Sequence, residues 1–313
     1  MEAAMTRSTA TGVLPAGLSA RVRVPASSAN LGPGFDCLGL ALALYDEVAV
    51  TVADAGVSVD VSGQAADQVP RDGRHLVARA VARGLEFAGA SAAGLHLDCR
   101  NVIPHSRGLG SSAAAVVGGL AAASALLVAD GRPGLTDAEL VQLSSEFEGH
   151  PDNAAASVLG SAVVTWSRGR GEFFARRLDL HSSIVVTVFV PQVESSTEAT
   201  RGLLPDAVPH ADAVFNVSRA ALGVVALTTD PDCLMDASDD RLHQPYRADA
   251  LADTTRLVSA LRERGHAASV SGAGPSALVL GTQPLGSDDA ALASGLGFEM
   301  IPVAVADGVE VLV

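Results

Sequence analysis

A glycine-rich segment from Pro104 to Ala115 (PHSRGLGSSAAA) carries the clearest chemical signal in this sequence of 313 residues. Gly108 and Gly110 have no side chains, so the backbone can turn tightly there and approach a ligand closely. The helix predicted to begin near Ser111 would direct its free N–H groups, and about half a positive charge, at that ligand. The hydroxyls of Ser111 and Ser112 could bind phosphate oxygen or Mg²⁺. A plain glycine-rich turn with a serine N-cap is equally consistent with this segment taken alone.

Two further segments combine glycine turns with polar side chains. The first, Pro25 to Leu42 (PASSANLGPGFDCLGLAL), places Asn30 and Asp36 around a turn between apolar stretches. A turn explains the glycines but not why an amide and a carboxylate flank them. The second, Ser269 to Leu280 (SVSGAGPSALVL), predicts a Gly-Ala-Gly-Pro turn between two buried strands, a weak signal by itself.

The sequence contains no lysine, because all 21 basic residues are arginine. A Walker-type phosphate loop, a protein kinase and a pyridoxal enzyme each need a lysine, so all three classes are excluded. Neither a Gly-x-Ser-x-Gly elbow nor a His-Glu-x-x-His motif is present, which argues against hydrolase and metalloprotease chemistry. His75, His96 and His243 have no metal-ligand spacing and are interpreted as ordinary surface or core residues.

Composition narrows the class of protein further. A net charge of −14 argues against a nucleic-acid partner, although a local backbone cradle could still bind ATP. Cys37, Cys99 and Cys233 are scattered, which fits a reducing cytoplasm and no disulfide framework. The apolar run 113–129 is a little short for a membrane span and is interrupted by Gly118, Gly119 and Ser124, so we predict a buried helix there and no membrane partner.

Hydrophobic periodicity predicts a mixture of strands and helices. Residues 21–24 alternate as a strand that Pro25 should end, and 46–61 alternate twice around Gly56, which predicts a hairpin. Further strands are predicted at 95–97, 162–166, 184–190, 268–270 and 277–280. Helices are predicted at 75–88, 111–129, from a capping box at Thr136 and Glu139 to Gly149, from Asp152, and near 196–204, 211–228 and 248–264.

In this order and spacing the three glycine segments resemble the GHMP kinase superfamily, and the resemblance extends from about Ala20 to the C-terminus. SSANLGPGFDCLGLAL and EGHPDNAAASVLG (148–160) resemble its homoserine kinase branch. The resemblance implies an α+β, two-domain GHMP kinase fold. We expect a flexible tail at 1–18, a ribosomal S5 domain 2-like, ATP-binding N-terminal domain at 19–168, and a ferredoxin-like C-terminal domain at 169–313. The loop with Gly169 and Gly171 is the predicted boundary.

The resemblance also implies ATP and Mg²⁺ as cofactors. The nucleotide-binding residues would be Pro104, Arg107, Gly108, Leu109, Gly110, Ser111, Ser112, Ala113 and Ala114. Ser112 would ligate the metal with a carboxylate, either Glu146 or Glu148, of which Glu148 is favoured because it belongs to the EGHPDN segment. Family members hold the adenine base near the position of 75–77.

The implied acceptor is L-homoserine, which would become O-phospho-L-homoserine in threonine biosynthesis in the cytoplasm. Its binding residues would be Asn30, Asp36, His150, Arg201 and Arg247, with Asp36 pairing the ammonium and the two arginines gripping the carboxylate. Catalysis would rest on orientation by Asn153 and Asn30, because an amide cannot accept a proton. Asp152 remains an alternative base.

Several other expectations stay open at this point. A homodimer is common in the family and is a weak expectation for this chain. A mevalonate-type small-alcohol kinase, or a nucleotide-binding sensor that has lost catalysis, are the alternative functions.

Overall fold

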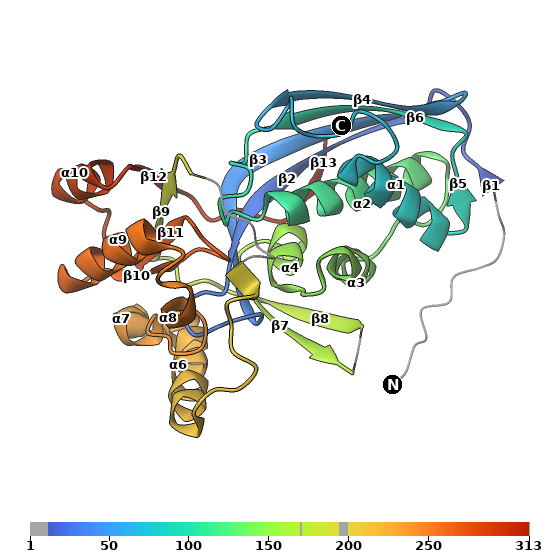
Figure 1. The fold of residues 1–313 in the computed structure, drawn as a ribbon. Helices are drawn as coiled ribbons and strands as arrows, with labels where there is room; N and C mark the ends of the chain where they lie inside the picture. The colour runs from blue at the N-terminus through green and yellow to red at the C-terminus, as the bar shows by residue number, and fades with distance from the viewer. Residues whose placement is uncertain (1–11, 170, 194–199, 313) are drawn as a thin grey trace.

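The computed structural model describes residues 12–169, 171–193 and 200–312. The chain builds two main sheets, one of seven strands and one of four, which lie side by side (Figure 1). A short parallel pair, β1 (Gly12–Val13) and β5 (Ala90–Ser91), lies beside the larger sheet.

The larger sheet has the order β13-β2-β3-β6-β4, and β7 joins it through β3 and carries β8. Its strands are β2 (Ser19–Ala29), β3 (Leu38–Ala53), β4 (Gly56–Gly63), β6 (Gly94–Asn101), β7 (Ala162–Arg168), β8 (Glu172–Leu178) and β13 (Glu310–Leu312). Helices α1 (Leu76–Phe87), α2 (Ser111–Ala129), α3 (Asp137–Glu148) and α4 (Asp152–Leu159) pack beneath its long strands, and β7 and β8 lie below α3 and α4 (Figure 1). Gly119 lets α2 approach α1 closely, since a Cβ there would lie 2.6 Å from the Cβ of Ala80.

The smaller sheet has the order β10-β11-β9-β12, with every neighbouring pair antiparallel. The strands of this sheet are β9 (Val185–Pro191), β10 (Ala267–Val270), β11 (Ala277–Gly281) and β12 (Phe298–Val303). The helices that lie between these strands in the sequence are α6 (His210–Thr228), η1 (Pro231–Cys233), α7 (Leu234–Ala237), α8 (Gln244–Arg247), α9 (Ala252–Glu263) and α10 (Ser287–Gly295). This strand order and the β-α-β-β-α-β succession define a ferredoxin-like arrangement, which confirms the predicted fold class.

Two predictions about the larger sheet were wrong. Pro25 does not end its strand, since β2 continues to Ala29. The pairing of β2 with β3 shifts its register between Pro25 and Ala26, so the proline, which has no N–H group to donate, lies at an irregularity of the strand pair. Residues 46–61 do form two strands, but not a hairpin, since β6 inserts between β3 and β4 and runs parallel to β4. That pairing depends on a segment more than thirty residues away, which local alternation cannot indicate.

Most other elements agree with the predictions. The capping box is present, with Thr136 Oγ1 accepting from the Glu139 amide at 3.3 Å and Glu139 Oε2 accepting from the Thr136 amide at 2.8 Å. Residues 196–199 of the helix predicted near 196–204 lie outside the described residues, and of 200–204 only Thr200 and Arg201 are helical. Two described helices, α2 and α6, are long and apolar enough to cross a membrane, but core helices of soluble proteins meet the same criteria, and 67% of the apolar window of α2 is buried.

The division at 168/169 stays a prediction. Both β8 and the C-terminal strand β13 belong to the larger sheet, so the chain returns to its first sheet at its end. Within the predicted tail, β1 pairs with β5 and Leu14 is buried, while residues 1–11 lie outside the described part of the chain.

Candidate functional site

A cleft opens where segments from both sheets meet. It is lined by these predicted site residues: Asn30, Arg107, Gly108, Gly110, Ser111, Ser112, Ala113, Glu148, His150, Asn153, Arg201 and Arg247. The structure therefore brings together side chains that are up to 217 residues apart in sequence, from Asn30 to Arg247. Pro104, Leu109, Ala114 and Asp36 do not line it.

The N-terminus of α2 forms one wall of the cleft. Gly110 is its N-cap, in the left-handed conformation with φ +69°, and has no side chain with which to cap the helix. The first-turn amides of α2, which include those of Ser111 and Ser112, therefore have no side-chain cap, and both serines line the cleft. This arrangement favours an anionic ligand.

Gly108 and Gly110 are needed for packing as well as for ligand approach, which the sequence did not indicate. A Cβ on Gly108 would lie 2.3 Å from the Ser271 carbonyl oxygen, and one on Gly110 would lie 2.2 Å from Ser27 Oγ. The Ser271 hydroxyl also donates to the Gly108 carbonyl at 2.7 Å. The three glycine segments therefore interlock, and we call Gly108–Ser112 the glycine loop.

Arg107 anchors the start of this loop. Its guanidinium donates to the carbonyls of His105 (2.8 Å), Pro191 (2.9 Å) and Gln192 (2.6 Å). These bonds tie the loop to the end of β9. The side chain of Leu109 packs in the core with 1% of its surface exposed, so it supports the loop from behind.

Ser112 and Glu148 lie together at the cleft, with Ser112 Oγ donating to Glu148 Oε1 at 2.6 Å. The alternative carboxylate, Glu146, is exposed and pairs with Arg83 at 3.1 Å. Glu146 does not line the cleft. A hydroxyl and a carboxylate oxygen are hard ligands of the kind that Mg²⁺ prefers, so Ser112 and Glu148 fit this ion.

On the opposite side, Asp36 and Arg201 form a bidentate ion pair. Arg201 donates from Nη2 to Asp36 Oδ1 at 2.7 Å and from Nη1 to Oδ2 at 3.0 Å. We predicted that Asp36 binds the acceptor ammonium and that Arg201 binds the acceptor carboxylate. In the structure, without an acceptor, the two side chains pair with each other. Asp36 lies behind Arg201, which lines the cleft. We call Asp36, His150, Arg201 and Arg247 the charged pocket.

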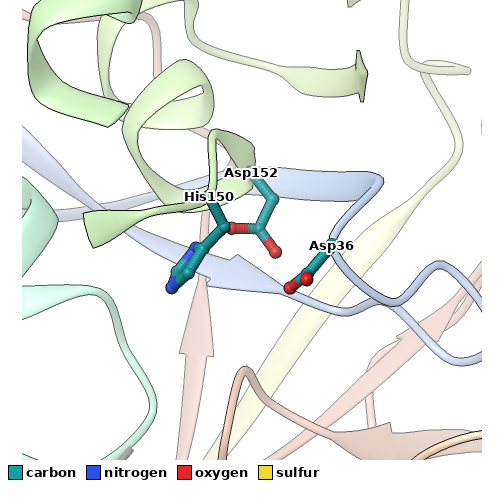
Figure 2. Close-up of side chains that lie close together, drawn as sticks. All are labelled: Asp36, His150 and Asp152. Carbon is teal, nitrogen blue, oxygen red and sulfur yellow. The ribbon is translucent and has the colours of Figure 1, made fainter. Parts of the chain in front are cut away.

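His150 is held by the carboxylate of Asp152. Its Nδ1 lies 2.8 Å from Asp152 Oδ1, which also accepts from the Asn153 amide at 2.8 Å. Figure 2 shows both Asp152 and Asp36 toward one side of the ring, while the other ring nitrogen points away from them. Burial lowers the pKa of His150, but the hydrogen bond and charge of Asp152 outweigh it, so the pKa lies above its ordinary value.

Asp152 does not reach the cleft, which weakens its candidacy as a base. It is 1% exposed, and its Oδ2 has no hydrogen-bond partner in the described structure. Ligand atoms of Asp36, His150 and Asp152 lie within 4.8 Å of one another, as in a metal site. Arg201 already neutralises Asp36 in this cluster, however.

The two predicted catalytic amides have different surroundings. Asn30 donates to the Gly272 carbonyl at 3.0 Å and accepts from the Asp36 amide at 2.9 Å, so both its polar groups join protein segments. Asn153 Nδ2 donates to Ser27 Oγ at 3.1 Å, and the Asn153 side chain lines the cleft.

Sequence reasoning missed some residues of the site. Ser27 and Ser271 support the glycine loop, and Gly272 and Ala273 line the cleft. All four lie inside segments that the glycine pattern singled out, so a systematic reading of those turns could have found them. The predicted adenine region around His75 is buried and does not line this cleft.

The sequence of this chain is similar to those of known proteins. Residues 75–161 match the family described as GHMP kinases N terminal domain. A homoserine kinase of Rhodococcus erythropolis is 59% identical over 305 residues, covering 95% of this chain and 97% of the relative. One of Mycobacterium tuberculosis is 54% identical over 302 residues, covering 95% and 96%.

The fold agrees with a solved structure. The crystal structure of homoserine kinase from Cytophaga hutchinsonii superposes with a TM-score of 0.80 at 25% identity, covering 94% of this chain and 98% of that chain. With relatives above half identity over nearly the whole length, the chain belongs to the homoserine kinase family of the GHMP kinases.

Proposed function

We propose that this chain transfers the terminal phosphoryl group of ATP to the side-chain hydroxyl of L-homoserine, giving O-phospho-L-homoserine in threonine biosynthesis in the cytoplasm. The observation that carries the proposal is one cleft that joins an uncapped helix N-terminus to a pocket of paired charges. The helix N-terminus can bind a triphosphate, and the pocket of paired charges can bind a small acceptor that carries one positive and one negative group.

The glycine loop would hold the phosphates with main-chain amides, which explains how the enzyme works without a lysine. Ser112 and Glu148 would hold Mg²⁺, supported by their 2.6 Å contact at the cleft. The ion would neutralise charge on the phosphates. Arg107 would act indirectly, by fixing the start of the loop.

The acceptor would exchange partners with the Asp36–Arg201 ion pair. A zwitterion brings one positive and one negative group, so its ammonium can replace Arg201 at Asp36 while its carboxylate replaces Asp36 at Arg201. Arg247 also lines the cleft and would bind the same carboxylate. Because neither protein charge is left unpaired, the exchange favours a zwitterionic acceptor over a neutral alcohol.

Phosphoryl transfer would then depend on positioning. The acceptor oxygen forms a bond to the terminal phosphorus, the bond from that phosphorus to the ADP oxygen breaks with its electron pair, and the hydroxyl proton passes to the transferred phosphoryl group. Asn153 would orient the hydroxyl, and Asn30 would hold the turn that carries Asp36. Asp152 lies outside the cleft, which supports orientation over general-base catalysis.

A coupled ADP-release assay tests this function. With ATP and Mg²⁺ we expect the highest kcat/KM for L-homoserine among L-homoserine, L-serine, L-threonine and mevalonate. Best turnover of mevalonate would establish the small-alcohol alternative, and ATP binding without turnover of any acceptor would establish a sensor. Size-exclusion chromatography tests the expected homodimer.

A further inference from the structure

We propose that His243 is a positioning residue for the acceptor-binding Arg247, which it holds by accepting a hydrogen bond at Nδ1. This inference rests on the proposed role of Arg247 in the acceptor site. His243 is fully buried and, unlike Arg247, does not line the cleft, so it would act only through Arg247.

Two hydrogen-bonding contacts of the His243 ring, together with Asp240 Oδ2 at 3.5 Å from Nε2, indicate its protonation state. Nε2 lies 2.6 Å from the Gly32 carbonyl oxygen, which can only accept, so Nε2 must carry a hydrogen. Nδ1 lies 3.2 Å from Arg247 Nη1, which can only donate, so Nδ1 must present its lone pair. One neutral tautomer satisfies both contacts. A doubly protonated ring would set an N–H group against the guanidinium.

The backbone around His243 is fixed by Asp240. The Asp240 carboxylate accepts from the amides of Leu242 (2.9 Å), His243 (3.1 Å) and Gln244 (2.7 Å). Asn216 donates to the same carboxylate at 2.8 Å. Burial lowers the pKa of His243 more than the charge of Asp240 raises it, which agrees with a neutral ring.

His243 thereby links Arg247 to the turn that carries Asp36. Gly32 begins this turn, and Phe35 within it lies with its ring centroid 5.4 Å from that of His243. The guanidinium carbon of Arg247 lies 5.5 Å from the same Phe35 centroid. The side chain of Arg247 is 1% exposed, so its direction depends on these neighbours and on the Thr200 carbonyl at 3.2 Å.

Two substitutions separate positioning from simple core filling. In His243→Asn the amide oxygen can stand near the Nδ1 position and keep an acceptor for Arg247, while the Gly32 contact is lost. In His243→Gln the amide nitrogen can stand near the Nε2 position and keep the Gly32 contact, while the Arg247 acceptor is lost. A residue that only fills space would be harmed comparably by both changes.

We expect His243→Gln to raise the KM for L-homoserine about tenfold, because a hydrogen bond to a charged group is lost. KM for ATP should stay within about twofold in both variants. His243→Asn should keep the acceptor KM within about threefold, although its Tm falls because the Gly32 carbonyl loses its partner. Equal increases in acceptor KM in the two variants, or increases that follow Tm, would overturn the inference.

Arg247→Ala and a double variant distinguish this inference from the proposed function. If Arg247→Ala leaves the acceptor KM unchanged, the proposed acceptor site fails. If Arg247→Ala raises that KM but His243→Gln does not, only the inference about His243 fails. We expect the double variant to match Arg247→Ala alone, since His243 acts through Arg247. Should His243→Gln not fold, an acceptor KM in His243→Asn as high as in Arg247→Ala overturns the inference.

Discussion

The glycine loop and the charged pocket face each other across one cleft but are built differently. The loop relies on main-chain groups, and its shape is set by close contacts of Gly108 and Gly110 with Ser271 and Ser27. The pocket relies on long side chains that neutralise one another, as Asp36 and Arg201 do. If the proposed function is correct, the backbone cradle can accept phosphate without rearrangement, whereas the paired charges of the pocket must exchange partners when the acceptor binds.

This difference predicts distinct responses to mutation. A change in the loop should disturb folding and nucleotide binding together, because one set of contacts serves both. A change at Arg201 or Asp36 should alter acceptor binding with less effect on the fold, because the side chains of this pair are partly exposed.

The largest effect is expected for Gly108→Ala. A Cβ would lie 2.3 Å from one backbone carbonyl oxygen and 2.8 Å from another, at a φ of +71° that already disfavours alanine. We expect a loss of about 4 kcal/mol or more in unfolding free energy, together with loss of ATP binding. Chemical denaturation and nucleotide titration measure the two effects.

Gly131→Ala is the matched control for this change. Gly131 also has a positive φ, +75°, but nothing lies within 4 Å of its added Cβ. Only the conformational penalty of about 1–2 kcal/mol should appear, with normal ATP binding. Similar losses in the two variants would show that backbone conformation, not interlocking, governs the loop.

Arg201→Ala tests the charged pocket. Removing Arg201 leaves the acceptor carboxylate with Arg247 alone, so kcat/KM for L-homoserine should fall roughly 30-fold to several thousandfold, equivalent to about 2–5 kcal/mol. KM for ATP should hardly change. Arg177→Ala, which removes an exposed pair with Asp307 at 3.5 Å, should behave like the unaltered enzyme. A comparable rise in the ATP KM of Arg201→Ala would break the separation of the two regions.

Glu148→Gln and its matched control Glu146→Gln test which of the two carboxylates holds the metal ion. Glu148 accepts from Ser112 at the cleft, so its change should lower activity about a hundredfold and raise the Mg²⁺ concentration needed for half-maximal rate. Glu146 points to Arg83, and its change should stay within about twofold. The reverse result would assign the metal to Glu146.

The smallest effect is expected on the pH dependence of stability, through the buried carboxyl group of Asp46. Asp46 accepts from the amides of Val102 (2.6 Å) and Ile103 (2.8 Å), just before the loop segment, and burial raises its pKa from 3.8 to about 6. Since the folded state holds this proton more tightly, the contribution of Asp46 to stability is greatest at low pH. It is lost as pH rises through about 6.

Asp46→Asn isolates this contribution. The stability of the unaltered protein relative to the variant should fall by about 2 kcal/mol between pH 4.5 and pH 7. Denaturation of both proteins at the two pH values gives this difference, in which other titrating groups cancel. An unchanged difference would mean that the ionised carboxylate is well satisfied by its two amides.

The amino-acid sequence by itself determined the helices, most strands, the glycine loop at the start of α2, and the absence of a lysine-based phosphate site. These features depend on local spacing, on capping residues such as Thr136 and Glu139, and on residue types. They persist wherever the segment lies in the fold, so periodicity and motif reveal them.

Only the tertiary structure decided which distant groups meet. It inserted β6 between β3 and β4, paired Asp36 with Arg201, and gave His243 a place between Gly32 and Arg247. Apart from the contact between His243 and Arg247, which are four residues apart, these contacts join residues far apart in the chain, and their formation depends on packing of whole elements. Spacing along the chain carries no information about such contacts, because they are set by distances in space.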